Sequence, residues 1–582
     1  MLKNQKIWYW VKIVFGLLWL SRMLHSKAYA SVYVLIAAAG LYCIHWNYVN
    51  RPKAPEGWRK LLLAVFAGLF SFCSVLANYE LYYAFRLEFG SISLVGGFLL
   101  MWEILLYACC HIPLKTQAWE KQTSPTRVFF TAFAIMAAID LFFLFVLEYP
   151  GTLTPDSISQ MNQLMSGSYS NHHPYWHTVV IKLFVNLGMA LFGDINHGVA
   201  VYCVFQILFM TASFAYVVVT LYQSNVPRKV VLAVFALYAL APYHIYFSFT
   251  VWKDVLFAGA ILLFVTALYR ILKSVGKHSW CDYVVLALGG LGFAVWRSNG
   301  WLACLAALLC SGLFLWKQHK KVLLIWLAIL VLGNAMKVPY LAAIGVRQPD
   351  LVESLSIPVQ QVARVIVEGV ELTEEERDMM ERVVDVEKIP SIYKSYISDP
   401  IKTEIREKNP RYFEENISQY LRLWVQLGLR YPGLYLFAWV DQTKGYWNSG
   451  YQYVTIMHEI YQNNLGLQKT LGTDDIRGKA AQWVFDMCVH GAPELGILSS
   501  IGLYVWLMAF AFLMCLTQKK KEALLALPAL MVVGTLLVAT PVYSELRYAY
   551  SVFTTLPLVL TVSVYDIPEK QKNEEKAEQS HG

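Results

Sequence analysis

The chain has 582 residues, of which 57% are apolar and 15% are charged. Apolar runs of about 20 residues recur along it, and only helices satisfy their own backbone groups in hydrocarbon, so an all-α polytopic membrane protein is predicted. The formal net charge of +8 comes from short basic clusters between these runs. Such clusters are typical of cytoplasmic loops and argue against a nucleic-acid partner.

About fourteen transmembrane helices are predicted from the apolar runs. Residues 1–127 hold about four of them, residues 128–336 form a transmembrane module, and residues 496–566 hold the C-terminal helices. The charged tail, 567–582, is expected to be cytoplasmic and disordered. The runs begin at Ile7, Ala28, Leu61, Ile92, Val128, Ala200, Val230, Val255, Tyr283, Trp301, Val322, Ile497, Ala523 and Tyr548.

The stretch 174–192 is also long enough to cross, but Lys182 interrupts it. If this stretch lies along the interface instead, the early basic loops share one face with every later basic cluster. The positive-inside rule therefore favours an interfacial helix, with both termini in the cytoplasm and the active site on the extracytoplasmic face of the cell membrane. Arg22 and Lys27 do not fit this scheme.

A large non-membrane insertion covers residues 337–495. The motif "TEEE", Thr373 to Glu376, has the spacing of a capping box before a helix. Prolines at 390, 400 and 410 punctuate further short helical stretches. The helix count places this mainly helical domain outside the cell, on the same side as the loop that precedes 174–192.

That first external loop, 149–176, reads "TPDSISQMNQLMSGSYSNHHPYW" from Thr154 to Trp176 and contains no lysine or arginine. The same topology brings three more polar motifs to the external face, namely "WKD" from Trp252, "WRSNGW" from Trp296 and "SELRY" from Ser544. Charged groups at membrane depth are costly and tend to mark function. The candidate residues are Asp156, Gln160, His172, His173, His177, Lys253, Asp254, Arg297, Asn299, Glu545 and Arg547.

Each candidate also has an ordinary structural explanation. Thr154-Pro155-Asp156 has the composition of a helix start, with an N-cap, a first-turn proline and an acid that favours the helix dipole. His173 and His177 have the i, i+4 spacing of a metal pair, yet no third ligand is evident, so hydrogen-bonding histidines are the better interpretation. The basic residues of these motifs could be headgroup anchors.

The order of these motifs resembles the GT-C superfamily of polytopic membrane glycosyltransferases. Protein O-mannosyltransferases of this superfamily carry an acid in the first external loop, followed by a "HPP"-type segment and an interfacial helix. Here "PDS" at Pro155 and "HHPYWHTVVIKLF" from His172 look like that arrangement. The resemblance extends over 128–564. Many members have a DE or DD pair in the loop, whereas Ser157 follows Asp156 here, so no metal cofactor is expected, although a divalent ion stays open.

The resemblance implies an inverting glycosyltransferase that moves a sugar from a polyprenyl-phosphate carrier in the lipid bilayer to a cell-envelope glycan, lipid or protein. Such a reaction needs a base beside the acceptor hydroxyl and cations beside the leaving phosphate. We expect Asp156 to be the catalytic base, on the analogy of inverting glycosidases. The substrate-binding residues would be Gln160, His172, His173, His177, Lys253, Asp254, Arg297, Asn299, Glu545 and Arg547.

Two other functions stay open at this point. A transporter or flippase of a lipid-linked or anionic substrate should show two related halves and charge near the membrane midplane, and neither is evident in the sequence. A glycan polymerase or ligase would also use an external site and a lipid-linked donor.

Overall fold

The computed structural model describes residues 2–25, 30–81, 87–116, 123–275, 280–451, 456–470, 475–489, 496–539 and 543–567. The protein is 78% helical with almost no strand, which confirms the predicted all-α class. Two short strands, β1 (Leu114–Lys115) and β2 (Tyr565–Asp566), pair in parallel within this described part. The described residues end at 567, so the predicted disordered tail lies outside them.

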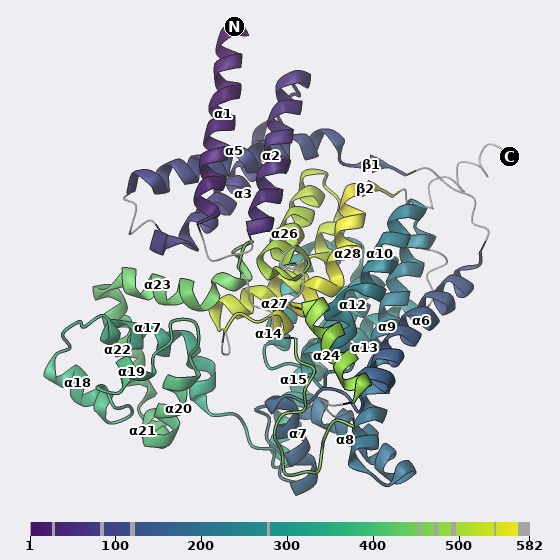
Figure 1. The fold of residues 1–582 in the computed structure, drawn as a ribbon, viewed down its shortest axis with the longest axis vertical. Coiled ribbons are helices and arrows are strands. Elements are labelled where there is room, and N and C mark those ends of the chain that lie inside the picture. Colours follow the sequence, from purple (N-terminus) through teal and green to yellow (C-terminus); the bar gives the residue numbers. More distant parts are fainter. Residues whose placement is uncertain are drawn as a thin grey trace.

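The N-terminal helices form a unit at the end of the molecule that carries the N-terminus (Figure 1), and their core also includes Leu513 and Met514 from near the C-terminus of the chain. The helices of this unit are α1 (Leu2–Met23), α2 (Ala30–Asn50), α3 (Gly57–Leu76) and α5 (Leu87–His111). Inside the unit, the buried Glu103 carboxylate accepts from Lys12 Nζ at 2.6 Å and from Asn47 Nδ2 at 2.7 Å. Pairing of this kind is how an acid is accommodated between apolar helices.

The central bundle surrounds α12, whose side chains are buried on nearly every side. A helix that is apolar all round belongs at the centre of a large helical protein, and α12 packs against α9, α13 and α28. The bundle consists of α6 (Pro125–Phe142) with the π-helix η1 (Phe143–Leu147), α7 (Pro155–Ser166), α8 (Tyr175–Phe192), α9 (Ile195–Gln223), α10 (Arg228–Leu240), α11 (Pro242–Ser248), α12 (Lys253–Lys273), α13 (Trp280–Val295), α14 (Gly300–Gln318), α15 (Lys320–Lys337), α16 (Pro339–Ala343), α24 (Ile476–Val489), α25 (Gly496–Ser499), α26 (Ile501–Thr517), η5 (Lys521–Leu525), α27 (Leu527–Val538), η6 (Leu546–Ala549) and α28 (Tyr550–Val564).

Nine helical segments of the described chain are long and apolar enough to cross a membrane, which supports a multi-pass membrane protein. Helices α10 and α11 would add a tenth span with a bend of 50°, whereas α13, α26 and α27 are apolar but shorter. The count of fourteen spans therefore stays a prediction. Helix α8 is one of the nine, so its predicted interfacial position also stays a prediction.

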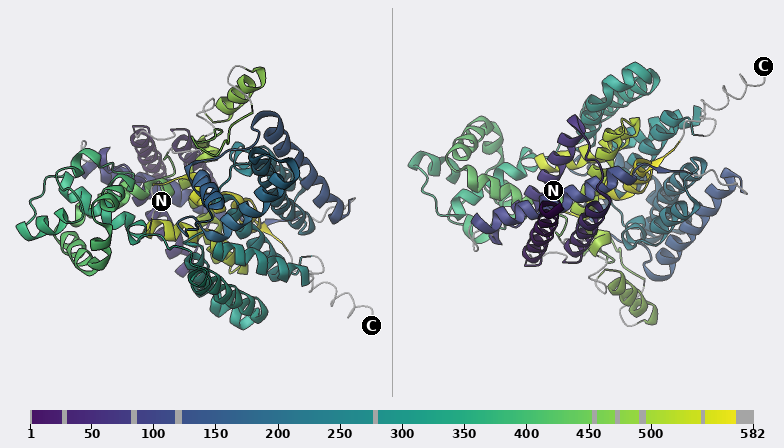
Figure 2. Two further views of the ribbon diagram at one scale, coloured as in Figure 1. Left: turned by 90° about the horizontal axis from the view of Figure 1, so that it is seen from below. Right: turned by 90° about the horizontal axis from the view of Figure 1, so that it is seen from above.

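A separate group of helices stands to one side of the bundle, and both views of Figure 2 show it apart. It consists of η2 (Leu351–Leu355), α17 (Ser356–Val367), α18 (Glu374–Glu381), α19 (Ile389–Ile392), α20 (Asp399–Lys408), α21 (Pro410–Glu415), α22 (Ile417–Arg430) and α23 (Pro432–Thr443). The capping box predicted at Thr373 is confirmed, because Glu376 N donates to Thr373 Oγ1 and Thr373 N donates to Glu376 Oε2.

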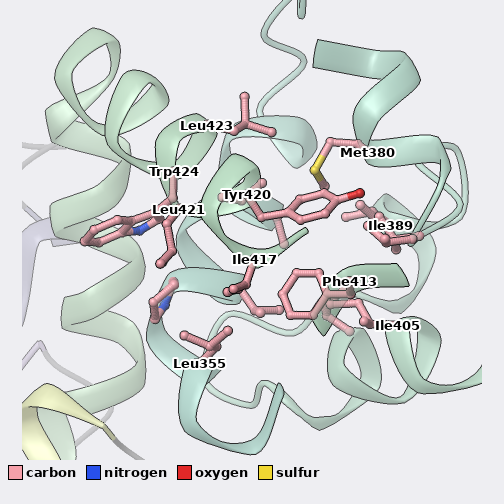
Figure 3. A pocket seen from close by; sticks show the side chains of 17 residues that line it. Leu355, Met380, Ile389, Ile405, Phe413, Ile417, Tyr420, Leu421, Leu423 and Trp424 are labelled. Atoms are coloured by element: carbon pink, nitrogen blue, oxygen red, sulfur yellow. The ribbon is translucent and has the colours of Figure 1, made fainter. Parts of the chain in front are cut away.

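These helices enclose their own apolar core. A cavity of about 60 Å³ lies inside it. Figure 3 shows Met380, Phe413 and Tyr420 converging on it from three helices. Later residues of the predicted insertion do not join this core. Residues 456–461 instead run beside the segment that precedes α7, where Tyr461 N donates to Leu153 O at 2.8 Å.

The C-terminal end of α23 connects this group of helices to the rest of the chain. The buried Asp441 carboxylate accepts from Tyr79 of the N-terminal unit at 2.8 Å, from Lys444 at 2.8 Å and from Arg364 of α17 at 3.2 Å. The turn η3 (Lys444–Tyr446) follows directly. One residue after Asp441, the carbonyl of Gln442 accepts from Ser544 Oγ at 2.9 Å, so the same stretch reaches the loop before η6.

Candidate functional site

The segment that leads into α7 is held between two other pieces of backbone. On one side, Thr152 N donates to Phe249 O at 3.1 Å and Val251 N donates to Thr152 O at 3.0 Å. On the other side, residues 459–461 pair with Leu153. Since backbone pairs on both flanks fix its path, the start of α7 has a defined position relative to α12.

Helix α7 begins at Pro155 with Thr154 as its N-cap, which confirms the helix start predicted from the sequence. Ser157 Oγ accepts from Thr154 N at 3.0 Å and donates to Val251 O at 2.7 Å. Trp252 Nε1 donates to Thr154 Oγ1 at 2.7 Å. Asp156 therefore occupies the first turn of a helix that is fastened to the residues just before α12.

Two cations from distant parts of the chain meet at Asp156. Its Oδ2 atom accepts from Lys253 Nζ at 3.3 Å and from Arg547 Nη1 at 2.9 Å. Lys253 is the first residue of α12 and Arg547 lies in η6. The Asp156 side chain is 28% exposed, against 14% for Lys253 and 11% for Arg547, so the carboxylate is the most accessible part of the cluster.

Lys253 has a second partner in this cluster, the buried side chain of His173. The Lys253 Nζ and His173 Nδ1 atoms are 3.2 Å apart. A lysine ammonium has only donors, so Nδ1 accepts this hydrogen bond and the imidazole is neutral. His173 thus orients Lys253 toward Asp156.

Arg547 is held from three directions. Its Nε donates to Glu545 Oε2 at 2.8 Å, and its Nη2 donates to the Tyr548 hydroxyl at 3.1 Å. The guanidinium carbon lies 4.8 Å from the ring centroids of both Trp252 and Tyr548. This combination of bidentate-capable donors and aromatic faces is characteristic of arginines that bind carboxylates or phosphates.

A second buried ion pair lies next to this cluster. Arg297 Nη1 is 2.7 Å from Asp254 Oδ1, and it donates to Tyr548 O at 3.2 Å. The Tyr548 ring contacts both guanidinium groups, with its centroid 4.9 Å from the guanidinium carbon of Arg297 and 4.8 Å from that of Arg547. Arg297 is only 5% exposed, so it supports the cluster from the buried side.

Charge sets the protonation states of the groups in the loops. Burial opposes ionisation of Asp156, but Lys253 and Arg547 hold the pKa of that carboxyl well below its usual range. Burial and the neighbouring Lys253 lower the pKa of His173 well below its usual value. Burial raises the pKa of Glu545 against the opposing effect of Arg547. The resting cluster therefore contains an ionised Asp156 and a neutral His173.

Gln160 and His177 lie in a different, closed network. Gln160 Nε2 donates to Thr178 Oγ1 at 2.8 Å, and Gln160 Oε1 is 3.1 Å from His177 Nδ1. His177 Nε2 lies 2.9 Å from the Tyr202 hydroxyl, which donates to Gln206 Oε1 at 2.9 Å. All of these side chains are buried. Both ring nitrogens of His177 are thus occupied by protein partners.

The amide of Gln206 closes this network on the loop before α12. Its Nε2 lies within hydrogen-bonding distance of the carbonyls of Phe247, Ser248 and Thr250, at 3.1, 3.0 and 2.7 Å. These carbonyls belong to the last residues of α11 and to the loop that follows it. The network therefore joins α7, α8, α9 and this loop, and it fixes the frame in which Asp156 and Lys253 meet.

The two remaining predicted residues lie outside the cluster. His172 is exposed and sits beside the acidic residues Asp350 and Glu353, which belong to the start of the lateral group of helices. Asn299 Nδ2 donates to Thr535 Oγ1 of α27 at 2.8 Å, which anchors the turn before α14. Within the described residues, neither His172 nor Asn299 contacts Asp156.

Sequence reasoning missed several residues near the site. Glu148 is fully buried, with Lys469 Nζ bonded to its Oε2 and His458 Nδ1 3.6 Å from its Oε1. A cavity of about 290 Å³ lies beside them, lined by Pro155, His458 and Phe485 among others. Glu148 could have been singled out from the sequence, because it is an acid at the end of an apolar run. Nothing in the sequence around its partners, His458 and Lys469, indicates that they bind it.

No group of three or more His, Cys, Asp or Glu side chains that could hold a metal ion occurs in the part of the chain that the structure describes. The predicted histidine pair does not form a ligand set, because His177 is engaged by Gln160 and Tyr202 and His173 by Lys253. The chemistry that the cluster itself offers is anion recognition by two cations, next to a carboxylate able to accept a proton once those cations are engaged elsewhere.

Comparison with known proteins gives one result that extends over most of the chain. Searches of the curated proteins and of the solved structures found no match. A family model described as a family of unknown function, DUF6020, matches residues 165–580. This range contains Lys253, Arg297 and Arg547, whereas Asp156 lies nine residues before it (165 − 156 = 9). The chain belongs to this family of unknown function, DUF6020.

Proposed function

We propose that the protein is a membrane glycosyltransferase that moves a sugar from a polyprenyl-phosphate carrier to an acceptor on the extracytoplasmic side. The observation that carries this proposal is the sharing of one carboxylate oxygen, Asp156 Oδ2, by Lys253 and Arg547. In the resting site, two cations bind one partly exposed carboxylate. An anionic group of a ligand can replace that carboxylate as their partner. The phosphate of the lipid carrier would be that anion.

In the proposed reaction, the donor phosphate takes over the hydrogen bonds of Lys253 and Arg547. Asp156 then loses the charges that depress its pKa and becomes a stronger base. The acceptor oxygen attacks the anomeric carbon, its proton passes to Asp156, and the sugar–phosphate bond breaks with its electron pair on the phosphate. The two cations stabilise the charge that the leaving group gains.

The neighbouring groups would position this machinery. His173 keeps Lys253 aligned, Glu545 keeps Arg547 aligned, and the pair of Arg297 with Asp254 supports the ring of Tyr548. We assign Gln160 and His177 a positioning role as well, because the network that buries them fixes α7. The acceptor would be a cell-envelope glycan, a lipid or a protein.

The test is incubation of the purified protein with a panel of radiolabelled polyprenyl-phosphate sugars and a cell-envelope extract, scored for label transferred from the carrier. Asp156→Asn should lower the transfer rate by about 10²–10⁴-fold. Asp194→Asn is the matched control, since Asp194 is half-exposed and bonds only within its own turn and to His197. Full activity of a folded Asp156→Asn protein would remove the proposed base.

The carrier or flippase alternative is favoured by one observation, the 50° break between α10 and α11, because broken helices are common in transporters. The same labelled donors separate the two functions. In proteoliposomes, a carrier would move the donor between leaflets with the sugar still attached, whereas a transferase would release a sugar-free carrier.

A further inference from the structure

Another cavity lies where the N-terminal unit meets the central bundle, and its lining includes Asp566 of β2. Figure 1 labels β2 close to β1, with which it pairs. The volume of the cavity is about 550 Å³. Its lining comes from the connection between α2 and α3, from the end of α5 and from the turn between α26 and η5. The residues that matter here are Lys53, Arg59, Cys110, Gln518, Lys520 and Asp566.

The lining carries more positive than negative charge. Lys53, Arg59 and Lys520 face a single acid, Asp566. Lys520 Nζ donates to Tyr565 O at 3.0 Å, which leaves two of its three N–H groups for another acceptor. Neither Lys53 nor Arg59 forms an ion pair with another side chain of the described residues, so the cations that the N-terminal unit contributes to the cavity lack an acidic partner there.

Gln518 adds a second, independent observation. Both polar atoms of its amide are buried, and neither has a hydrogen-bond partner in the described protein. Buried polar groups are nearly always paired, so an orphaned amide indicates a partner that belongs to the site, such as a ligand or an ordered water. A bound oxyanion would accept from Gln518 Nε2 and from the cations around it.

Cations at helix ends have an ordinary role as topological signals on the cytoplasmic side. That role requires only that they reach headgroups or solvent. It does not require a cavity between two units of the fold, and it does not account for a buried amide without a partner. The convergence of these three features points to recognition of one particular ligand.

We propose that this cavity binds a phosphate-bearing anion, which bridges Arg59 of the N-terminal unit and Lys520 of the central bundle. Arginine offers a planar fork that matches phosphate oxygens, and lysine adds a mobile point charge. The anion would be either the headgroup of an anionic phospholipid or a free phosphate compound. Because both units contribute ligands, binding stabilises their contact. The proposal is independent of the proposed transferase activity.

The experiment uses the full chain and two probes. Inorganic phosphate is titrated into the protein in detergent, and phosphatidylglycerol is supplied in phosphatidylcholine nanodiscs. The readouts are the thermal unfolding midpoint and the rate at which a maleimide labels Cys110, with Cys281, near the start of α13, as an exposed reference thiol in the same chain. We expect at least one probe to raise the midpoint and to slow labelling of Cys110 alone.

Matched variants localise the effect. Arg59→Ala and Lys520→Ala should each weaken binding by about tenfold, the usual cost of one charge-assisted hydrogen bond. Lys60→Ala and Lys519→Ala remove neighbouring lysines that do not line the cavity and should leave the affinity unchanged. Gln518→Leu keeps the volume and should weaken binding by about fivefold.

The outcomes separate the sources of the anion. Binding of phosphate alone assigns a free phosphate compound, and binding of phosphatidylglycerol alone assigns a lipid headgroup. The proposal is overturned if neither probe binds, or if Arg59→Ala and Lys520→Ala bind as the parent protein does. Arg59 is exposed and Lys520 is half-buried, with one hydrogen bond to a carbonyl, so both variants should fold.

Discussion

Two polar clusters start from the same short helix, α7, and they differ in what they leave free. In its first turn, Asp156 meets Lys253 and Arg547, and its carboxylate remains partly exposed. One turn later, Gln160 enters a chain of hydrogen bonds through His177, Tyr202 and Gln206 that is entirely buried.

The comparison separates a group that could react from groups that support the fold. Every polar atom described above in the closed hydrogen-bond network has a protein partner. A substrate could bind such an atom only by breaking an existing hydrogen bond. The open cluster instead holds charge that an incoming anion can take over. Residue type alone did not make this distinction, since histidine and amide side chains occur in the same loop as the acid.

Among the variants of residues that surround Asp156, the largest effect is expected from Arg547→Lys. Arg547 joins Asp156, Glu545 and Tyr548 through three different nitrogens, and a lysine ammonium has no such fork. We expect the transfer rate to fall by about 10²-fold, as on loss of one charge-stabilising donor. A rate within threefold of that of the parent protein would mean that the Asp156 cluster, like the closed network, only supports the fold.

Tyr202→Phe tests the closed network from the other side. The change leaves His177 Nε2 and Gln206 Oε1 buried without their partner, which should lower the free energy of unfolding by about 1–3 kcal/mol. Denaturant unfolding of the purified protein measures this. Transfer per folded molecule should stay close to that of the parent, because the hydroxyl bonds to His177 and Gln206 and not to the members of the Asp156 cluster.

His173→Gln should change how stability depends on pH. The pKa of His173 is lowered in the folded protein, so below about pH 6.5 the unfolded chain binds more protons. This histidine therefore destabilises the fold as the pH falls from about 6.5, by at most about 1.4 kcal/mol per pH unit. The variant should lose less stability than the parent between neutral pH and about pH 5, as measured by unfolding midpoints. An identical slope in both proteins would contradict a neutral, buried His173.

The smallest effect is expected for His172→Ala. His172 is exposed and faces Asp350 and Glu353 instead of Asp156. Stability should change by no more than about 0.5 kcal/mol, as for most surface substitutions, and the transfer rate should stay the same. A large loss of transfer would mean that the lateral helices contribute to the site.

The sequence was most informative where local rules decide the structure. Apolar runs predicted where helices occur, Thr154 and Pro155 predicted the start of α7, and Thr373 with Glu376 predicted a capping box. These features depend on neighbours in the chain. The helix boundaries and the number of spans followed less well, because α13, α26 and α27 are shorter than the bilayer rule requires.

Within the site, tertiary packing decided what the sequence left open. Asp156 and Arg547 are 391 positions apart, and only their motifs, not their contact, could be inferred. The three cations were expected to act together, yet Arg297 pairs with Asp254 behind Tyr548. The burial of His177 depends on Tyr202 of α9, a helix whose polar residues are hidden within a long apolar run.

The position of Asp441 bears on any attempt to shorten the chain. Its carboxylate accepts hydrogen bonds from the N-terminal unit, from α17 and from the turn that follows α23. The carbonyl of the next residue, Gln442, accepts from Ser544, three residues before Arg547. Removing the first four helices would strip Tyr79 from this buried acid and uncover Trp506, which packs on Phe66 and Phe70. A truncated protein would thus expose oily surface and disturb a junction far from the cut.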